Sequence, residues 1–203
     1  MPLTLSQTVA PTEEPVELLE MKNHLRVTVG DDDQLILSLI KSVRDILERE
    51  MRRQFVTATY TFSLDEFPSA HVSSGFSAGR FIPLPRPPLQ SVTSIQYQDS
   101  DNTQQTLATT VYGVDSTSEP GRIYLKSGQS WPSTYDVPNA VIITYKAGWT
   151  SANLIPPSIL SAIFLLVGHF YESREATVTL HVPQEIPLGL KMLIWLNRIP
   201  EVY

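Results

Sequence analysis

Four histidines are the side chains in this sequence best suited to acid–base catalysis or metal binding, because imidazole changes its charge near neutral pH and binds transition metals. They stand at positions 24, 71, 169 and 181, and none belongs to a His-x-x-x-His or His-Glu-x-x-His pattern. His169 has the most polar neighbourhood, with Tyr171, Glu172 and Glu175 close behind it. A histidine in such an apolar stretch more often ends a buried helix face than performs catalysis, so we interpret His169 as structural.

Carboxylates are the second candidates for chemistry. The aspartates at 31–33 are consecutive, but they lack the ligand spacing and the distal glutamate of a calcium-binding loop. Acids at the start of an apolar-periodic segment are typical of a helix cap. The acids available for a glycosidase-type pair are Asp65, Glu66, Asp115 and Glu119. Each lies at an expected strand end or turn, where acids occur for ordinary reasons.

Aromatic side chains offer a third possibility, a platform on which sugar rings stack. The candidates are Trp131, Trp149, Tyr97, Tyr124 and Tyr145. Aromatic residues in a small β-rich domain usually form its core, and we favour that interpretation. The sequence also contains neither a phosphate-binding glycine motif nor a cysteine. We therefore predict no catalytic residue, no metal site and no cofactor, and a chain that is not an enzyme.

Composition narrows the class further. The 203 residues carry a formal net charge of −6, and 42% are hydrophobic, which suits a folded chain with a real core. Tight DNA binding is not expected, since phosphate contacts rely on clustered Lys and Arg. The most apolar run, 159–171, is too short to span a bilayer. Met1–Leu5 lacks the pattern of an export signal, and the absence of cysteine fits a reducing cytoplasm.

The first third of the chain is expected to be helical. Residues 1–14 have no periodicity and should form a flexible arm or an extended clasp. A short helix is expected from Pro15 to about Arg26, followed by Gly30 and a long amphipathic helix capped by the acids at 31–33. The apolar stripe of the long helix has i, i+3, i+4 spacing and consists of Leu35, Ile36, Leu39, Ile40, Val43, Ile46, Leu47 and Met51.

The opposite face of this helix is charged and carries Lys41, Arg44, Asp45, Glu48, Arg49, Arg52 and Arg53. Acid-first i, i+4 pairs are expected there between Asp45 and Arg49 and between Glu48 and Arg52. The simplest interpretation is a solvated face with cations near the C-terminal end of the helix dipole. The alternatives are a DNA-binding patch, or a contact of the four arginines with a neighbouring subunit.

Residues 57–149 change to alternating β-branched and aromatic residues with frequent turn signals. The expected strands are Thr57–Leu64, Arg80–Leu84, Val92–Gln98, Gln105–Leu107, Tyr112–Asp115, Arg122–Leu125 and Ala140–Lys146. The prolines at 83, 85, 87 and 88 form a stiff corner that should stay out of a sheet interior. Asp99–Asn102 signals a hairpin turn.

The last part of the chain returns to helix. Pro156-Pro157-Ser158 begins a helical region that should run to about Glu175, and Thr177–Val182 then alternates as an extended strand. A final apolar helix is expected at Leu188–Ile199. The sequence thus predicts an α+β protein. Residues 15–56 and 150–203 form a helical bundle, 1–14 an N-terminal arm, and 57–149 an inserted antiparallel β subdomain.

Eight short segments, taken in order, carry a family resemblance. They are Glu14-Pro15-Val16, His24–Val27, Asp31–Asp33, Pro83–Val92, Ser118–Ile123, Tyr145–Trp149, His169–Glu175 and Ile186–Gly189. Over nearly the whole chain, their order and spacing resemble the head–tail connector (adaptor) proteins of tailed bacteriophages, in the group with a β-rich insert between connector helices. No single motif among them is diagnostic.

The resemblance implies a structural protein of the virion neck, made in the host cytoplasm. Such a protein would form a ring, expected to be a dodecamer, that docks on the portal and joins the capsid to the tail or to a tail-completion protein. DNA would pass through the lumen without tight binding, and no membrane would be involved. Two alternatives stay open: a tail-completion or terminator protein, and a carbohydrate-binding or hydrolytic β-module of the tail.

Three candidate contact surfaces follow. The final helix is apolar on more than one face, so it must pack against a partner or against Leu39, Val43 and Phe164 of its own subunit. The portal-docking candidates are Leu188, Met192, Trp195, Ile199, Val202 and Tyr203. The candidate inter-subunit strand contributes Val178, Leu180 and Val182, and the candidate inter-subunit helix face contributes Arg44, Arg49, Arg52 and Arg53.

Overall fold

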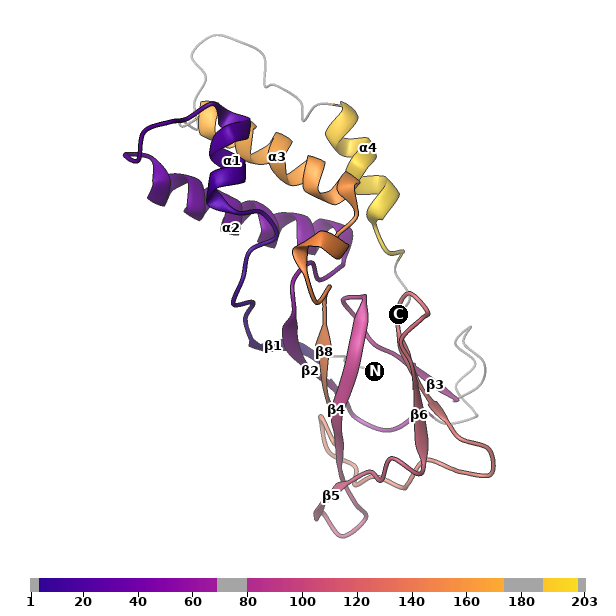
Figure 1. Cartoon of the computed structure of the whole chain (residues 1–203). Coiled ribbons are helices and arrows are strands. Elements are labelled where there is room, and N and C mark those ends of the chain that lie inside the picture. Colours follow the sequence, from indigo (N-terminus) through magenta and orange to yellow (C-terminus); the bar gives the residue numbers. More distant parts are fainter. Residues whose placement is uncertain (1–3, 69–79, 174–187, 201–203) are drawn as a thin grey trace. The chain divides into compact units, whose positions relative to one another are not determined.

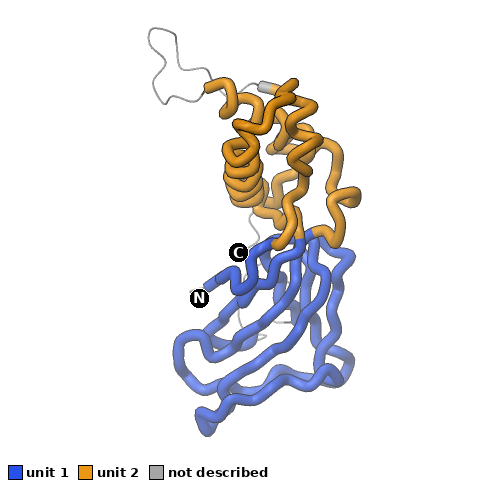
Figure 2. Tube along the Cα trace, turned by 60° about the vertical axis from the view of Figure 1, so that its left-hand side comes forward, with its two compact units in different colours: residues 1–11, 57–148, 201–203 blue, residues 12–56, 149–200 orange. Residues whose placement is uncertain are grey.

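The chain forms two compact units, each with its own hydrophobic core. The computed structural model describes residues 4–68, 80–173 and 188–200. One unit contains Thr57–Gly148 together with the N-terminal residues up to Pro11, and the other contains Thr12–Val56 and Trp149–Pro200 (Figure 2). The strands belong to the first unit and the α-helices to the second (Figure 1). The predicted α+β fold class, a helical bundle with an inserted antiparallel β region, is confirmed.

The β unit contains two antiparallel sheets. The five-stranded sheet has the order β1 (Thr4–Val9), β2 (Ala58–Leu64), β8 (Val141–Ala147), β4 (Leu89–Gln98) and β5 (Gln104–Thr106). The three-stranded sheet has the order β3 (Phe81–Pro83), β7 (Arg122–Leu125) and β6 (Tyr112–Asp115). All seven strands expected between residues 57 and 149 are present, with ends within three residues of those predicted.

Alternation of side chains builds the core of this unit. In β2 and β8, every second residue is buried, and the buried sets face each other in the pairs Tyr60–Tyr145 and Phe62–Ile143. The rings of Tyr60 and Tyr145 stack with centroids 5.9 Å apart. The Tyr145 side chain is fully buried, and its hydroxyl donates a hydrogen bond to the Pro85 carbonyl oxygen at 2.8 Å. The proline corner is thereby held against the sheet that it does not enter.

The N-terminal segment differs from the sequence expectation of a free arm. Thr4–Val9 is extended, as in the alternative of an extended clasp. It forms a regular strand that pairs with β2, with Leu5 opposite Phe62. Leu5 alone packs against the core, and the other residues of β1 are exposed. Because nearly every residue of β1 faces solvent, the strand has no hydrophobic alternation that could have revealed it.

Helices α1 (Leu18–Leu25), α2 (Asp33–Met51), α3 (Pro157–Glu172) and α4 (Leu188–Asn197) form the second unit, with a short 3₁₀ turn at Ala152–Leu154. The predicted stripe of α2 is fully buried at Ile36, Ile40, Val43, Leu47 and Met51. Leu35 and Ile46, at the margins of the stripe, are exposed. The buried side of α3 supplies Ile159, Ala162, Ile163, Leu166 and Val167 to the same core.

The acids at 31–33 are placed differently from the expected helix cap. Asp32 is the N-cap residue of α2, but its side chain makes no capping hydrogen bond. It accepts a hydrogen bond from the Tyr171 hydroxyl at 2.5 Å, and Asp33 forms an ion pair with Lys22 at 2.5 Å. The carboxylates of Asp32 and Asp33 thus bind side chains on α3 and α1, and Asp32 makes no capping hydrogen bond at the start of α2. These carboxylates join three helices.

A buried polar cluster lies where α2 meets the segments that precede and follow it. The Arg44 guanidinium donates to both oxygens of Glu14, at 2.6 and 3.3 Å, and to Glu48 at 2.9 Å. The other Glu48 oxygen accepts hydrogen bonds from the Phe55 backbone N–H at 2.8 Å and the Gln54 amide at 2.7 Å. Burial lowers the pKa of Arg44, but its hydrogen bonds and its attraction to Glu14 and Glu48 outweigh burial and raise that pKa above its ordinary value. Arg44 therefore stays charged.

This cluster corrects the expected solvated helix face. The side chains of Arg44 and Glu48 are only 7% and 6% exposed, so they belong to the interior of the unit. The expected surface pair between Asp45 and Arg49 does form, at 3.1 Å.

Among the described residues, no helix combines the length and the apolar character needed to cross a membrane.

Two ion pairs of the same helix and the same spacing give a stability test. Replacing Arg44 with Leu should lower the free energy of unfolding by about 3 kcal/mol, because Glu14 and Glu48 are left without their cation. Replacing Arg49 with Leu should cost less than about 1 kcal/mol, since its pair with Asp45 is exposed. Urea unfolding followed by circular dichroism measures both, and equal losses would contradict the structural role of the cluster.

Candidate functional site

Helix α4 presents an exposed apolar surface. Met192, Trp195 and Leu196 are 63%, 74% and 57% exposed, and their i, i+3, i+4 spacing places them on one side of the helix. We call these three residues the α4 outer face. The other side packs into the core through Leu190, which is 2% exposed, and through the partly buried Leu193 and Ile194. Such a helix is attached to its own subunit by one side and is open to a partner on the other.

Polar contacts fix the C-terminal end of α4. The Asn197 carbonyl oxygen accepts a hydrogen bond from Arg53 at 2.6 Å, and the Asn197 amide donates to the Ser158 hydroxyl at 3.0 Å. The Ile199 N–H then donates to the Met51 carbonyl oxygen at 3.0 Å. The last turn of α4 is thereby joined to the end of α2 and the start of α3. A cation at a helix C-terminus also complements the helix dipole.

The predicted portal-docking residues are divided by this arrangement. Met192 and Trp195 lie together on the α4 outer face, as the prediction required. Ile199 does not, because the helix ends at Asn197 and the following turn buries Ile199 to 8% exposure. The side chain of Leu188, and residues Val202 and Tyr203, lie outside the described residues. Leu196 was missed as a candidate, although its spacing from Met192 was a usable signal.

The final helix was expected to pack against a partner or against its own subunit. Helix α4 packs against α2 and α3, so it does not project as a separate unit. The competing expectation, packing onto the helices of its own subunit, holds for its inner side. The predicted inter-subunit strand with Val178, Leu180 and Val182 lies outside the described residues and stays a prediction.

The predicted inter-subunit helix face does not exist as one surface. Arg44 is buried with Glu14 and Glu48, and Arg53 donates to Asn197 of its own chain. Arg52 takes a left-handed conformation, φ 56°, as it ends α2. Only Arg49 has a highly exposed side chain, 70%, and it pairs with Asp45. The spacing of charged residues along α2 could not show that Arg44 would bind Glu14, which lies 30 residues away in the sequence.

Of the residues considered for catalysis or metal binding, His71, Glu175 and His181 lie outside the described residues. Within the described ranges, no group of three or more His, Asp or Glu side chains could hold a metal ion. His169 lies near the C-terminal end of α3 and contacts the ring of Phe170 at 5.7 Å. The aromatic candidates are mostly core: Tyr145 is buried, and Trp131 stacks on Phe67 at 4.9 Å. Tyr124, at 37% exposure, is the exception.

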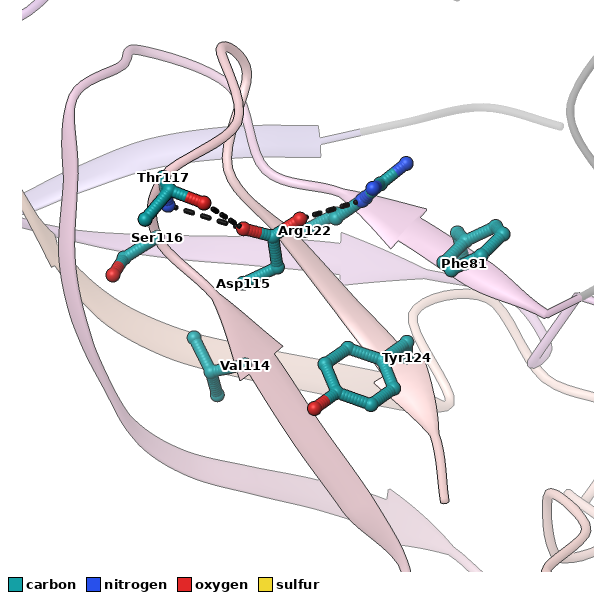
Figure 3. Close-up of a pocket in the computed structure, with 7 residues that line it drawn as sticks. All are labelled: Phe81, Val114, Asp115, Ser116, Thr117, Arg122 and Tyr124. Carbon is teal, nitrogen blue, oxygen red and sulfur yellow. Dashed lines mark hydrogen bonds and ion pairs between the residues drawn. The ribbon is translucent and has the colours of Figure 1, made fainter. Parts of the chain in front are cut away.

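Tyr124 lines an open pocket on the three-stranded sheet, shown in Figure 3. Asp115 and Arg122 face each other there at 2.9 Å, and the Arg122 guanidinium also lies 4.7 Å from the centre of the Phe81 ring. The Asp115 carboxylate accepts hydrogen bonds from the hydroxyls of Ser118 and Thr117, at 2.7 and 2.8 Å, and from their backbone N–H groups. Every partner favours the charged form, so Asp115 is suited to fixing a turn and poorly suited to accepting a proton.

Solved structures with the same fold come from a gene transfer agent (GTA) particle. A chain of the structure "Neck of empty GTA particle computed with C6 symmetry" matches with a TM-score of 0.76 and 19% identity, covering 98% of this chain and 97% of that chain. The chain shares its fold with this neck component. A chain of "Virion of native gene transfer agent (GTA) particle" matches at the same identity and coverage with a TM-score of 0.77. "Neck of native GTA particle computed with C12 symmetry" gives 0.69.

No protein-family model matches the chain, and no curated protein matches it in sequence. The similarity is therefore one of three-dimensional structure, and it extends over both units, since the aligned part covers nearly the entire chain. The match therefore includes the helices of one unit and the strands of the other.

The Asp115 carboxyl gives a pH test. The Ser118 and Thr117 hydroxyls, followed by Arg122, hold its pKa well below the usual range. A depressed pKa means that these interactions stabilise the fold above the ordinary aspartate pKa of about 3.9 and lose their effect only as pH falls through the lower folded value. Carboxyl carbon NMR shifts should show Asp115 still ionised at about pH 3. Protonation at the ordinary pKa would contradict the hydrogen-bond network.

Proposed function

We propose that this chain is a structural neck protein of a tailed-phage-like particle, a head–tail connector whose copies form a ring around the DNA channel. The observation that supports this most is the similarity of its fold, over 98% of the chain and with a TM-score of 0.76, to a chain in a GTA neck. The family resemblance of the ordered sequence segments points independently to the same place in a virion, between capsid and tail. A structural role needs surfaces for partners, and no catalytic group.

The proposed ring is a dodecamer. The GTA neck structures that share the fold were computed with C12 and C6 symmetry, both of which fit twelve copies. The proposed partners are the portal protein on one side and the tail or a tail-completion protein on the other. The formal charge of −6 per chain favours a channel lining that is acidic or neutral, and such a lining would make few contacts with DNA phosphates and suit passage of DNA without tight binding.

The α4 outer face is the proposed portal contact. A tryptophan that is 74% exposed beside Met192 and Leu196 combines residue types that are enriched at the centres of protein interfaces. The exposed residues Lys191 and Arg198 flank this apolar centre, so the matching surface should be an apolar pocket with acidic residues at its margin. Since the end of α4 is held through Asn197, the helix backbone that carries these three apolar side chains is held against its own unit.

The alternative of a hydrolytic β-module receives no support from the pocket. Of its four candidate acids, Asp115 is held by Arg122 and two hydroxyls, and Asp65 accepts a hydrogen bond from the Asn139 N–H at 2.9 Å. Both carboxylates stabilise loops beside strand ends. A glycosidase would need two carboxylates that face a shared substrate.

Microscopy and mass photometry test the proposed function directly. The purified full chain, alone and mixed with the portal protein of its particle, should form rings or cap the portal with twelve copies. Monomers that neither assemble nor bind the portal under any ratio would contradict the connector role. The same images show whether the ring forms before docking.

The contribution of Trp195 gives a second test. Trp195→Ala should weaken portal binding by about 2 kcal/mol, or roughly thirtyfold in Kd, because the residue is proposed to fill the central pocket. Leu19→Ala is the matched control, since Leu19 on α1 is 68% exposed but does not belong to the α4 outer face. Calorimetry or interferometry measures both variants, and equal affinities for them would remove Trp195 from the contact.

DNA binding provides a third test. The assembled ring should bind duplex DNA weakly, with little dependence on salt, because many phosphate contacts would make the affinity fall steeply as salt rises. Fluorescence anisotropy of a labelled duplex across a salt series measures this. Tight binding at low salt with a steep salt slope would show a DNA-gripping lumen instead.

A further inference from the structure

The two outermost strands of the five-stranded sheet are β1 and β5, and among the described residues the outer edge of each pairs with no other strand. In the described part of the chain, β1 pairs only with β2, and β5 pairs only with β4. The outer backbone N–H and C=O groups of such strands can pair with another strand. At six residues, β1 is longer than any other strand at the edge of a sheet in the described structure.

Neither edge is guarded by a charged residue or by proline, although β5 is short and β1 contains a bulge. Edge strands are commonly guarded by charged residues or proline. β1 reads Thr-Leu-Ser-Gln-Thr-Val and β5 reads Gln-Gln-Thr, so both are uncharged and free of proline, and both are largely exposed. β3, an edge strand of the other sheet, contains Pro83. A bulge near Thr8 interrupts β1, which leaves Thr4–Gln7 as its regular part.

We infer that β1 of one copy pairs with β5 of the next copy, so that five-stranded sheets join edge to edge around the ring. This inference rests on the proposed function, because it requires a ring. In a ring, neighbouring subunits meet head to tail, so every subunit needs two different contact surfaces. The two opposite edges of the five-stranded sheet supply such a pair of surfaces. Ser, Thr and Gln side chains on both strands can form hydrogen bonds across the new pair, and no charge on either edge opposes it.

The arrangement of the sheet makes the contact testable by cross-linking. Within one copy, β1 and β5 are separated by four strand spacings, about 19 Å in all. Cysteines placed on the two edges are therefore too far apart to be joined within one subunit by a disulfide. The natural chain contains no cysteine, so the introduced thiols are the only ones present.

The experiment uses the full chain with Ser6→Cys and Thr106→Cys, both at exposed positions, and a short bis-maleimide whose reach is below that separation. Assembled rings should give a ladder of covalent oligomers on a denaturing gel. The matched control, Ser42→Cys with Thr106→Cys, pairs β5 with the exposed side of α2 and should stay monomeric on the gel. Dimers from Ser6→Cys alone would show twofold β1–β1 pairing and overturn the inference.

Edge charges give an independent readout. Ser6→Lys with Thr106→Lys should abolish ring formation without changing the thermal unfolding of the monomer, and Ser6→Lys with Thr106→Glu should restore rings.

If rings persist in the double-lysine variant and the cysteine pair gives no ladder, the edge contact is wrong while the connector role stands. If the unsubstituted chain forms no ring, alone or with the portal, both fail.

Discussion

The helical unit depends on one buried charge, that of Arg44. Its guanidinium holds Glu14, in the segment that leads into α1, and Glu48, one turn further along α2. Glu48 in turn holds Gln54 and Phe55, and the Phe55 carbonyl oxygen accepts a hydrogen bond from the Trp149 N–H at 3.3 Å. The chain passes between its two units after Pro11, Val56, Gly148 and Pro200. The connected cluster holds residues close to the first three of these four crossings. A buried cation with two carboxylates tolerates little displacement, because any movement leaves charge without a partner.

This constraint explains why a β region can be inserted into a helical protein without disturbing it. The five core residues of α2 and the buried side of α3 form one cluster, although residues 57–148 separate the two helices in sequence. Val56 and Trp149 form a parallel bridge at the point where the chain leaves and returns. The insertion therefore begins and ends at neighbouring residues. The helical core can keep the same packing whatever segment lies between these two residues. Each unit buries its own apolar side chains, which is the usual condition for an inserted domain.

Sequence patterns predicted most elements, and their failures have a common physical cause. The stripe on α2 and the alternation in β2 and β8 gave correct elements because local periodicity reflects a single buried face. β1 lacks such a face, and its existence depends on pairing with β2, about 55 residues later in the chain. The positions of Arg44, Asp32 and Ile199 were likewise decided by distant partners: Glu14, Tyr171 and the Met51 carbonyl oxygen. For the candidate site, the sequence could indicate an apolar final helix, but the packing of Leu190, Leu193 and Ile194 was needed to show which side of that helix remains exposed.

The contacts of Asn197 with Arg53 and Ser158 also affect how a partner would be met. A terminal helix that orders only on binding must lose its conformational freedom at that moment, which lowers affinity for a given contact area. Here α4 is ordered when the subunit folds, so its conformational entropy is already lost before any encounter. Association through Met192, Trp195 and Leu196 would then resemble the docking of rigid surfaces, with a heat-capacity change set by the contact area alone and without a contribution from coupled folding.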